Sequence, residues 1–103
     1  MLSKKLIIAM MFILMLAAGG VQAGGDAANG KALSVDCVDC HGDAGLGDED
    51  VPGIAGMDAA EQAQKLADFK SGAVESEMVD YVSELSEQDM LDLAAYYATL
   101  PAN

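Results

Sequence analysis

Apolar residues near the C-terminus recur at steps of three and four positions, which is the repeat of one face of an α-helix. The stripe consists of Met90, Leu93, Ala94, Tyr97 and Leu100. The pattern Ser86-x-x-Asp89 is typical of a helix start, and Pro101 follows the end of the segment. We therefore predict a helix from Ser86 to about Thr99, with the apolar stripe facing the core.

A second helix is predicted to begin at Asp58. The pattern Asp58-x-x-Glu61 resembles a capping box, and Gly72 lies where a helix should stop. The repeat of this segment runs through Ala59, Gln62/Ala63, Leu66 and Phe69/Lys70. Within it, Leu66 and Phe69 are predicted to be the buried anchors.

The remaining segments predict two shorter helices and one loop. Residues 26–39 read as a short helix that runs into the two cysteines, and residues 76–84 read as another. Residues 42–56 hold five glycines and one proline, which is the composition of a loop. No segment alternates convincingly between apolar and polar residues as a strand does. We therefore predict an all-α fold with about three to five helices.

The first 23 residues are predicted to be a secretory signal. Lys4 and Lys5 precede an uncharged apolar run over residues 6–18, and residues 21–23 (VQA) provide a cleavage site after Ala23. The rival interpretation is an uncleaved membrane anchor, but a spanning helix needs about 20 apolar residues and this run is shorter. Residues 24–103 then form one exported, periplasmic domain without a membrane span.

The charge of this domain restricts its partners. The domain contains all 17 acidic residues of the chain but only three lysines, Lys31, Lys65 and Lys70, and the chain has no arginine. Such a surface repels nucleic acid and anionic lipid headgroups, and it attracts proteins with a basic patch. We therefore expect no nucleic-acid partner and a docking partner with a basic surface.

The chemistry of the chain is concentrated in residues 37–41 (CVDCH). The spacing C-x-x-C-H is the attachment signature of a c-type haem. Cys37 and Cys40 can each form a thioether to one of two adjacent vinyl groups of the porphyrin, and His41 then presents its imidazole to the iron. A domain this small buries too little apolar surface to be stable by itself, and a covalent haem provides the additional stabilisation. We predict one haem c.

Two other interpretations of the cysteine pair are weaker. A thioredoxin-like redox pair requires a βαβ context, and no strand precedes Cys37. A closed zinc site usually has four Cys or His ligands, whereas this chain contains two cysteines and one histidine.

The other face of the iron needs a ligand from elsewhere in the chain. A second histidine is absent, so the candidates after residue 23 are Met57, Met78 and Met90. Met90 lies on the core-facing stripe, and Met57 reaches the iron only if the preceding loop folds tightly. Met78 has enough chain behind it to wrap the far side of a haem. Spacing favours Met78 and leaves Met57 open.

These residues resemble small bacterial class I cytochromes c, over most of the chain after residue 23. The matching pieces are 37–41 (CVDCH), 51–56 (VPGIAG), 69–72 (FKSG), Met78 seven residues before Leu85-Ser86, and 92–97 (DLAAYY). The Pro-x-x-Ala-Gly and Phe-Lys-x-Gly pieces within 51–56 and 69–72 look most like single-haem relatives of the diheme cytochromes c and like the haem subunit of flavocytochrome c sulfide dehydrogenase. The resemblance implies the class I cytochrome c fold around one covalent haem.

The resemblance also implies roles for particular residues. Met78 would be the distal iron ligand, and Pro52 would offer its backbone carbonyl to the imidazole of His41. The family crosses its first and last helices through a small residue against an aromatic, which suggests Gly30 against Tyr96 or Tyr97. The aromatic residue that the family usually carries on the first helix is absent here.

The function implied is that of an electron carrier and not an enzyme. The alternatives are a haem subunit of a flavoprotein (sulfide) dehydrogenase, a five-coordinate haem sensor or peroxidase, and a thiol redox protein.

Overall fold

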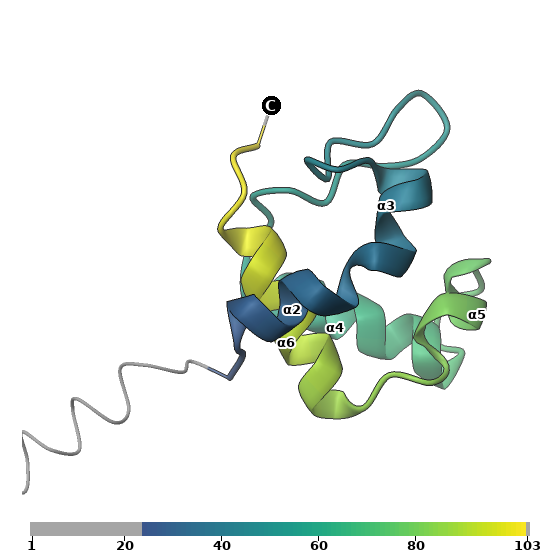
Figure 1. Ribbon diagram of the computed structural model, residues 1–103. Helices are drawn as coiled ribbons and strands as arrows, with labels where there is room; N and C mark the ends of the chain where they lie inside the picture. Colours follow the sequence, from purple (N-terminus) through teal and green to yellow (C-terminus); the bar gives the residue numbers. More distant parts are fainter. Residues whose placement is uncertain (1–23, 103) are drawn as a thin grey trace, which may run out of the picture.

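The computed structural model describes residues 24–102, and the predicted signal at 1–23 lies outside them. The described part of the chain contains five helices and no strand. They are α2 (Ala27–Leu33), α3 (Val35–His41), α4 (Ala59–Ser71), α5 (Met78–Val82) and α6 (Glu87–Ala98) (Figure 1). The predicted all-α class is confirmed. None of these helices has the length and apolar character that a membrane crossing requires.

The helix predicted over residues 26–39 is two helices, which corrects the prediction. The chain turns at Ser34, whose hydroxyl donates to the Lys31 carbonyl at 2.7 Å and whose own carbonyl accepts from Cys37 N at 2.8 Å. The second helix also extends to His41. Because of this break, α3 leaves the direction of α2 (Figure 1), and it carries both cysteines and the histidine together.

The helices α4 and α6 follow the predicted boundaries. The Asp58 side chain accepts from Glu61 N at 3.1 Å, and Gly72 ends α4 in the left-handed region with φ of 83°. At α6 the reciprocal capping box between Ser86 and Asp89 is complete. The helix α5 occupies only part of the predicted segment 76–84.

The apolar core is small and gathers around α6, which packs against α2 and α4. The buried apolar residues are Leu66, Val82, Met90, Leu93, Ala94 and Tyr97. Four of the five predicted stripe residues are among them, and Leu100 packs at the margin. Phe69, predicted to be buried, is only partly so and packs against this cluster.

The crossing of α2 and α6 depends on a glycine. A Cβ on Gly30 would lie 2.8 Å from the Cβ of Tyr96 and would collide with the Asp92 carbonyl. The small-residue crossing that the family resemblance suggested therefore forms against Tyr96, while Tyr97 lines a cavity on another side of α6. Only a residue without a side chain allows the two backbones to approach this closely.

A buried carboxylate joins the same two helices. Asp92 is 3% exposed and accepts from Asp26 N at 2.7 Å, from Asn29 Nδ2 at 2.7 Å and from Gln88 Nε2 at 2.9 Å. The backbone hydrogen bond from Asp26, with the two amides, lowers the pKa of Asp92. The ionised carboxylate is therefore part of the α2–α6 contact.

We expect Asp92→Asn to lower the free energy of unfolding at pH 7 by about 1–3 kcal/mol, because buried donors lose a charged acceptor. A carboxyl whose pKa is lower in the folded state stabilises the fold above its unfolded pKa of about 3.9, and this stabilisation is lost as pH falls through the folded pKa. The difference between wild type and variant in the free energy of unfolding, measured with urea, should therefore become smaller below about pH 4. Exposed Glu84→Gln serves as the control, and a gap of equal size at pH 7 and pH 3 would contradict the assignment.

Candidate functional site

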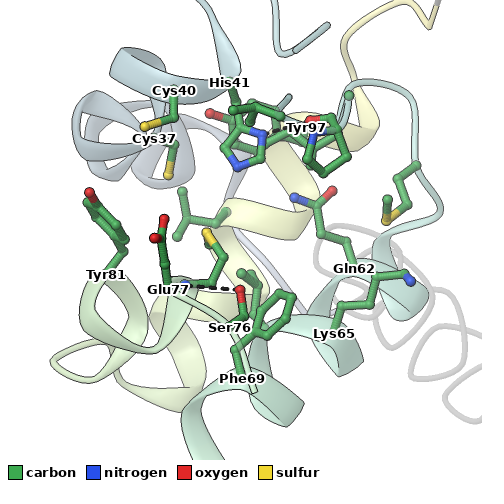
Figure 2. A pocket seen from close by; sticks show the side chains of 18 of the residues that line it. Cys37, Cys40, His41, Gln62, Lys65, Phe69, Ser76, Glu77, Tyr81 and Tyr97 are labelled. Carbon is green, nitrogen blue, oxygen red and sulfur yellow. Dashed lines mark hydrogen bonds between the residues drawn. The ribbon is translucent and has the colours of Figure 1, made fainter. Parts of the chain in front are cut away.

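A cavity of about 390 Å³ opens between α3, the loop after it, α4, α5 and α6 (Figure 2). It is lined by every residue that the sequence analysis singled out for haem binding: Cys37, Cys40, His41, Pro52 and Met78. Most of its lining surface is apolar, with Ile54, Leu66, Phe69 and Leu93 among the walls. The fold thus brings residues from both halves of the described chain to one site.

The two cysteines lie three residues apart on α3 and are not joined by a disulfide. Cys37 is partly buried and Cys40 is exposed. Burial raises the pKa of the Cys37 thiol, and the neighbouring Asp36 raises it further against an opposing contact with Tyr97. A redox-active dithiol needs a lowered thiol pKa. The environment of Cys37 therefore speaks against the thiol redox interpretation.

His41 is the last residue of α3 and is 6% exposed. Its Nδ1 lies 2.8 Å from the Pro52 carbonyl oxygen, so the Nδ1–H form of the ring donates to that oxygen. This hydrogen bond selects the tautomer in which Nε2 carries a free lone pair. Figure 2 shows the imidazole pointing into the cavity, where that lone pair can bind a metal ion.

The loop between α3 and α4 places the Pro52 carbonyl by its own backbone hydrogen bonds. Gly47 N donates to the His41 carbonyl at 2.8 Å, and Ile54 N donates to the Gly45 carbonyl at 2.7 Å. Gly47 has φ of 69°, and a Cβ there would lie 2.7 Å from the Pro52 carbonyl oxygen. A side chain at Gly47 would therefore displace the acceptor of His41.

Two of the three methionines in the described chain line the cavity. Met78 is the first residue of α5, and its backbone N–H donates to the Ser76 hydroxyl at 3.1 Å. Met78 also packs against the buried cluster. Met57 lines the cavity from the end of the loop. Met90 is 6% exposed within the core and is not one of the lining residues.

Two polar residues of the site were predicted from the sequence only as helix positions and not as part of the site. Gln62 is 4% exposed and Tyr97 is 1% exposed, and both line the cavity. The Gln62 Oε1 and the Tyr97 hydroxyl have no hydrogen-bond partner among the described residues. Burial, reinforced by the nearby Cys37, raises the pKa of Tyr97. The sequence did contain a signal for Gln62, because this glutamine lies in the same helical repeat as the core-facing residues Leu66 and Phe69 of α4.

The residues of this cavity fit a covalently bound haem. The volume falls within the range of about 300–1,000 Å³ that is usual for ligand sites. Thiols suitable for thioether formation, an oriented imidazole and a thioether sulfur all border an apolar space. The unpartnered polar atoms of Gln62 and Tyr97 are the kind of feature that a bound group satisfies.

Comparison with known proteins agrees with this chemistry. Residues 27–101 match the family model described as Cytochrome c. Cytochrome c4 of Thiocapsa roseopersicina is 38% identical over 84 residues, covering 81% of this chain and 41% of that protein. Cytochrome c-554(547) of Halothiobacillus neapolitanus is 37% identical over 89 residues, covering 74% of this chain and 98% of that protein.

A solved structure is also similar. The cytochrome c4 structure from Acidithiobacillus ferrooxidans superimposes with a TM-score of 0.69 at 31% identity, covering 76% of this chain and 50% of that one. The chain thus spans about half the length of the cytochrome c4 proteins that it matches, and nearly all of the c-554(547) relative.

Proposed function

This chain belongs to the cytochrome c family, as a small bacterial class I member, and we propose that it carries single electrons on one haem with histidine and methionine as iron ligands. The family is one of covalently attached haem c. The number of haems and the ligand set are our proposals, and they rest on the one C-x-x-C-H motif and the residues around the cavity.

Each site residue has a distinct task in this proposal. Cys37 and Cys40 hold the haem by thioethers, and His41 binds iron through Nε2. Met78 would hold the iron through its sulfur. The haem supplies a one-electron iron couple, whose potential depends on ligand identity, burial and nearby charge.

The protein's own groups orient these ligands. The Pro52 carbonyl accepts the Nδ1–H of His41, so the ring keeps the orientation that presents Nε2. The Ser76 hydroxyl accepts the Met78 N–H at the start of α5. This hydrogen bond fixes the backbone from which the Met78 sulfur extends.

The observation that carries the proposal is the convergence of His41 and Met78 on one apolar cavity. His41 comes from α3 and Met78 from α5, and the two are 37 positions apart in the sequence. Both line the cavity beside the two cysteines. An iron ligand must line the cavity, which Met78 and Met57 do and the core residue Met90 does not.

The test is the absorption spectrum and haem content of the protein produced with haem-attachment machinery. We expect one haem per chain that survives denaturation, a low-spin spectrum with a weak red sulfur-to-iron band, and no carbon monoxide binding by the reduced protein. A high-spin spectrum with ready carbon monoxide binding would instead support a five-coordinate haem.

We also propose that residues 1–23 direct export, that residues 24–103 are the working domain in the periplasm, and that the redox partner docks through a basic patch. Three carboxylates, Asp36, Asp50 and Glu77, border the haem cavity. Attraction between this surface and a cation speeds association and is screened by salt.

Higher ionic strength should therefore slow electron transfer to a cationic oxidant and accelerate electron transfer to an anionic one. Oxidation of the reduced protein by a cationic cobalt phenanthroline complex should slow about tenfold or more between 10 mM and 500 mM salt. Oxidation by the anion ferricyanide should accelerate over the same range. Stopped-flow kinetics gives both rates, and two flat profiles would refute electrostatic steering.

A further inference from the structure

Tyr97 carries a buried polar group that the ligation scheme leaves unexplained. Its side chain is 1% exposed on α6, and its hydroxyl has no hydrogen-bond partner among the described residues. A buried hydroxyl without a partner destabilises a fold, and phenylalanine would fill the same space without that cost. We therefore expect the hydroxyl to be bonded when the cavity holds its haem.

The Tyr97 hydroxyl faces two polar side chains near the attachment helix α3. Burial raises the pKa of Tyr97, the nearby Cys37 raises it further, and Ser34 opposes them. The Ser34 hydroxyl already donates to the Lys31 carbonyl at 2.7 Å, so it can offer Tyr97 only an acceptor oxygen. Figure 2 shows Tyr97 on the same side of the cavity as the two cysteines. The candidate partners of the hydroxyl are therefore the Cys37 sulfur and the Ser34 oxygen.

Cys37 is the attachment cysteine that belongs to the core. It packs against the apolar cluster around α6, whereas Cys40 is exposed and lies outside that cluster. Burial raises the pKa of the Cys37 thiol, and the contact with Tyr97 lowers it, as expected of a hydroxyl that donates toward sulfur. The two attachment cysteines are thus in different surroundings, and only Cys37 lies beside a buried hydroxyl.

Attachment of a haem changes what the Cys37 sulfur can do. The thiol adds across a vinyl double bond, so that the S–H bond breaks, a carbon–sulfur bond forms, and the hydrogen goes to the other vinyl carbon. The resulting thioether sulfur keeps its lone pairs but has no hydrogen, so it can only accept a hydrogen bond. A hydroxyl beside this sulfur must therefore be the donor.

We propose that the Tyr97 hydroxyl donates a hydrogen bond to the Cys37 sulfur once the haem is attached, so that Tyr97 positions the haem through this cysteine. This inference rests on the proposed covalent haem. The hydrogen bond ties α3 to the core helix α6. It also draws electron density from the sulfur, which disfavours the oxidised haem and raises the reduction potential.

The first test is the stability of the haem-loaded Tyr97→Phe protein, which lacks the hydroxyl and keeps the ring. Loss of a hydrogen bond should raise the equilibrium constant of unfolding about fivefold. Removal of an unpartnered hydroxyl would instead leave the stability unchanged or increase it. Tyr96→Phe is the matched control, because Tyr96 is the preceding residue of α6 and packs at the Gly30 crossing, outside the cavity lining. Its unfolding constant should equal that of wild type.

The second test reports on the sulfur itself. The reduction potential of Tyr97→Phe should lie below that of wild type, and that of Tyr96→Phe should not. In Cys40→Ala, where Cys37 forms the remaining thioether, the carbon–sulfur stretching band in the resonance Raman spectrum should shift after refolding in deuterium oxide. Adding Tyr97→Phe should abolish this isotope shift, and adding Ser34→Ala should preserve it.

Two results would overturn the proposal. One is a Tyr97→Phe protein that is as stable as wild type or more stable and has the same reduction potential. The other is an isotope shift that disappears with Ser34→Ala and persists with Tyr97→Phe. If Cys40→Ala does not fold, the stability and the potential of the proteins with both cysteines decide.

The haem content separates this inference from the proposed function. Haem that survives denaturation in wild type, together with no effect of Tyr97→Phe, would leave the covalent haem standing and refute the contact with Cys37. Wild type that loses its haem on denaturation would refute the covalent attachment on which the contact depends.

Discussion

Met78→Ala should convert the protein into one with an open iron coordination site. The weak red band should disappear, and the reduced protein should bind carbon monoxide. Methionine ligation raises the reduction potential, so the potential should fall on the order of 0.1–0.3 V, part of the roughly 0.8 V range that axial ligands control. Redox titration followed in the visible region measures these changes in one experiment.

The matched control is Met57→Ala, because Met57 lines the same cavity. This variant should keep the red band and exclude carbon monoxide. The core variant Met90→Ala should lose about 2–5 kcal/mol of stability and keep the native spectrum. Loss of the band in Met57→Ala with its retention in Met78→Ala would assign the ligand to Met57.

Replacing both Cys37 and Cys40 by alanine should abolish covalent haem and most of the helical structure. The described chain buries only six apolar residues, and the cavity of about 390 Å³ lies beside them. A domain of this size has a net stability of only about 5–10 kcal/mol, and losing the group that fills its centre removes more than that. Haem staining after denaturing electrophoresis and far-UV circular dichroism provide the readouts.

The single variants Cys37→Ala and Cys40→Ala test whether one attachment is enough. Each should retain one thioether and a partly folded, less stable protein, with lower haem yield than wild type. A double variant that remains fully helical and free of haem would show that the polypeptide core suffices by itself.

The helices α4 and α6 could be predicted because their capping residues and their packing against the core favour the same boundaries. Asp58 and Gly72 bound α4, and Ser86 begins α6 with a capping box that the structure completes. The break at Ser34 could not be predicted in the same way. Apolar positions continue across the break. The turn depends on the hydrogen bonds of Ser34, and serine as a residue type also occurs within helices, so its presence alone does not predict a break.

The candidate site shows the same division. The C-x-x-C-H spacing is a local pattern, so it could be read without a fold. The place of Met78 beside the same cavity depends on how α5 packs, and the preference over Met57 rested on chain length and resemblance. The position of the Pro52 carbonyl at 2.8 Å from His41 depends on loop turns at Gly45 and Gly47, which composition alone does not specify.

The contact between α2 and α6 also determines when the polypeptide can fold. Asp26 and Asp92 are 66 positions apart, and their hydrogen bond belongs to the crossing at Gly30. A chain that is exported unfolded and N-terminus first, as proposed above, presents the haem-attachment residues before α6 arrives to receive α2. Closing so long a segment is slow relative to local helix formation. The cysteines therefore remain accessible in a loosely structured chain, which is the state that an attachment enzyme can reach.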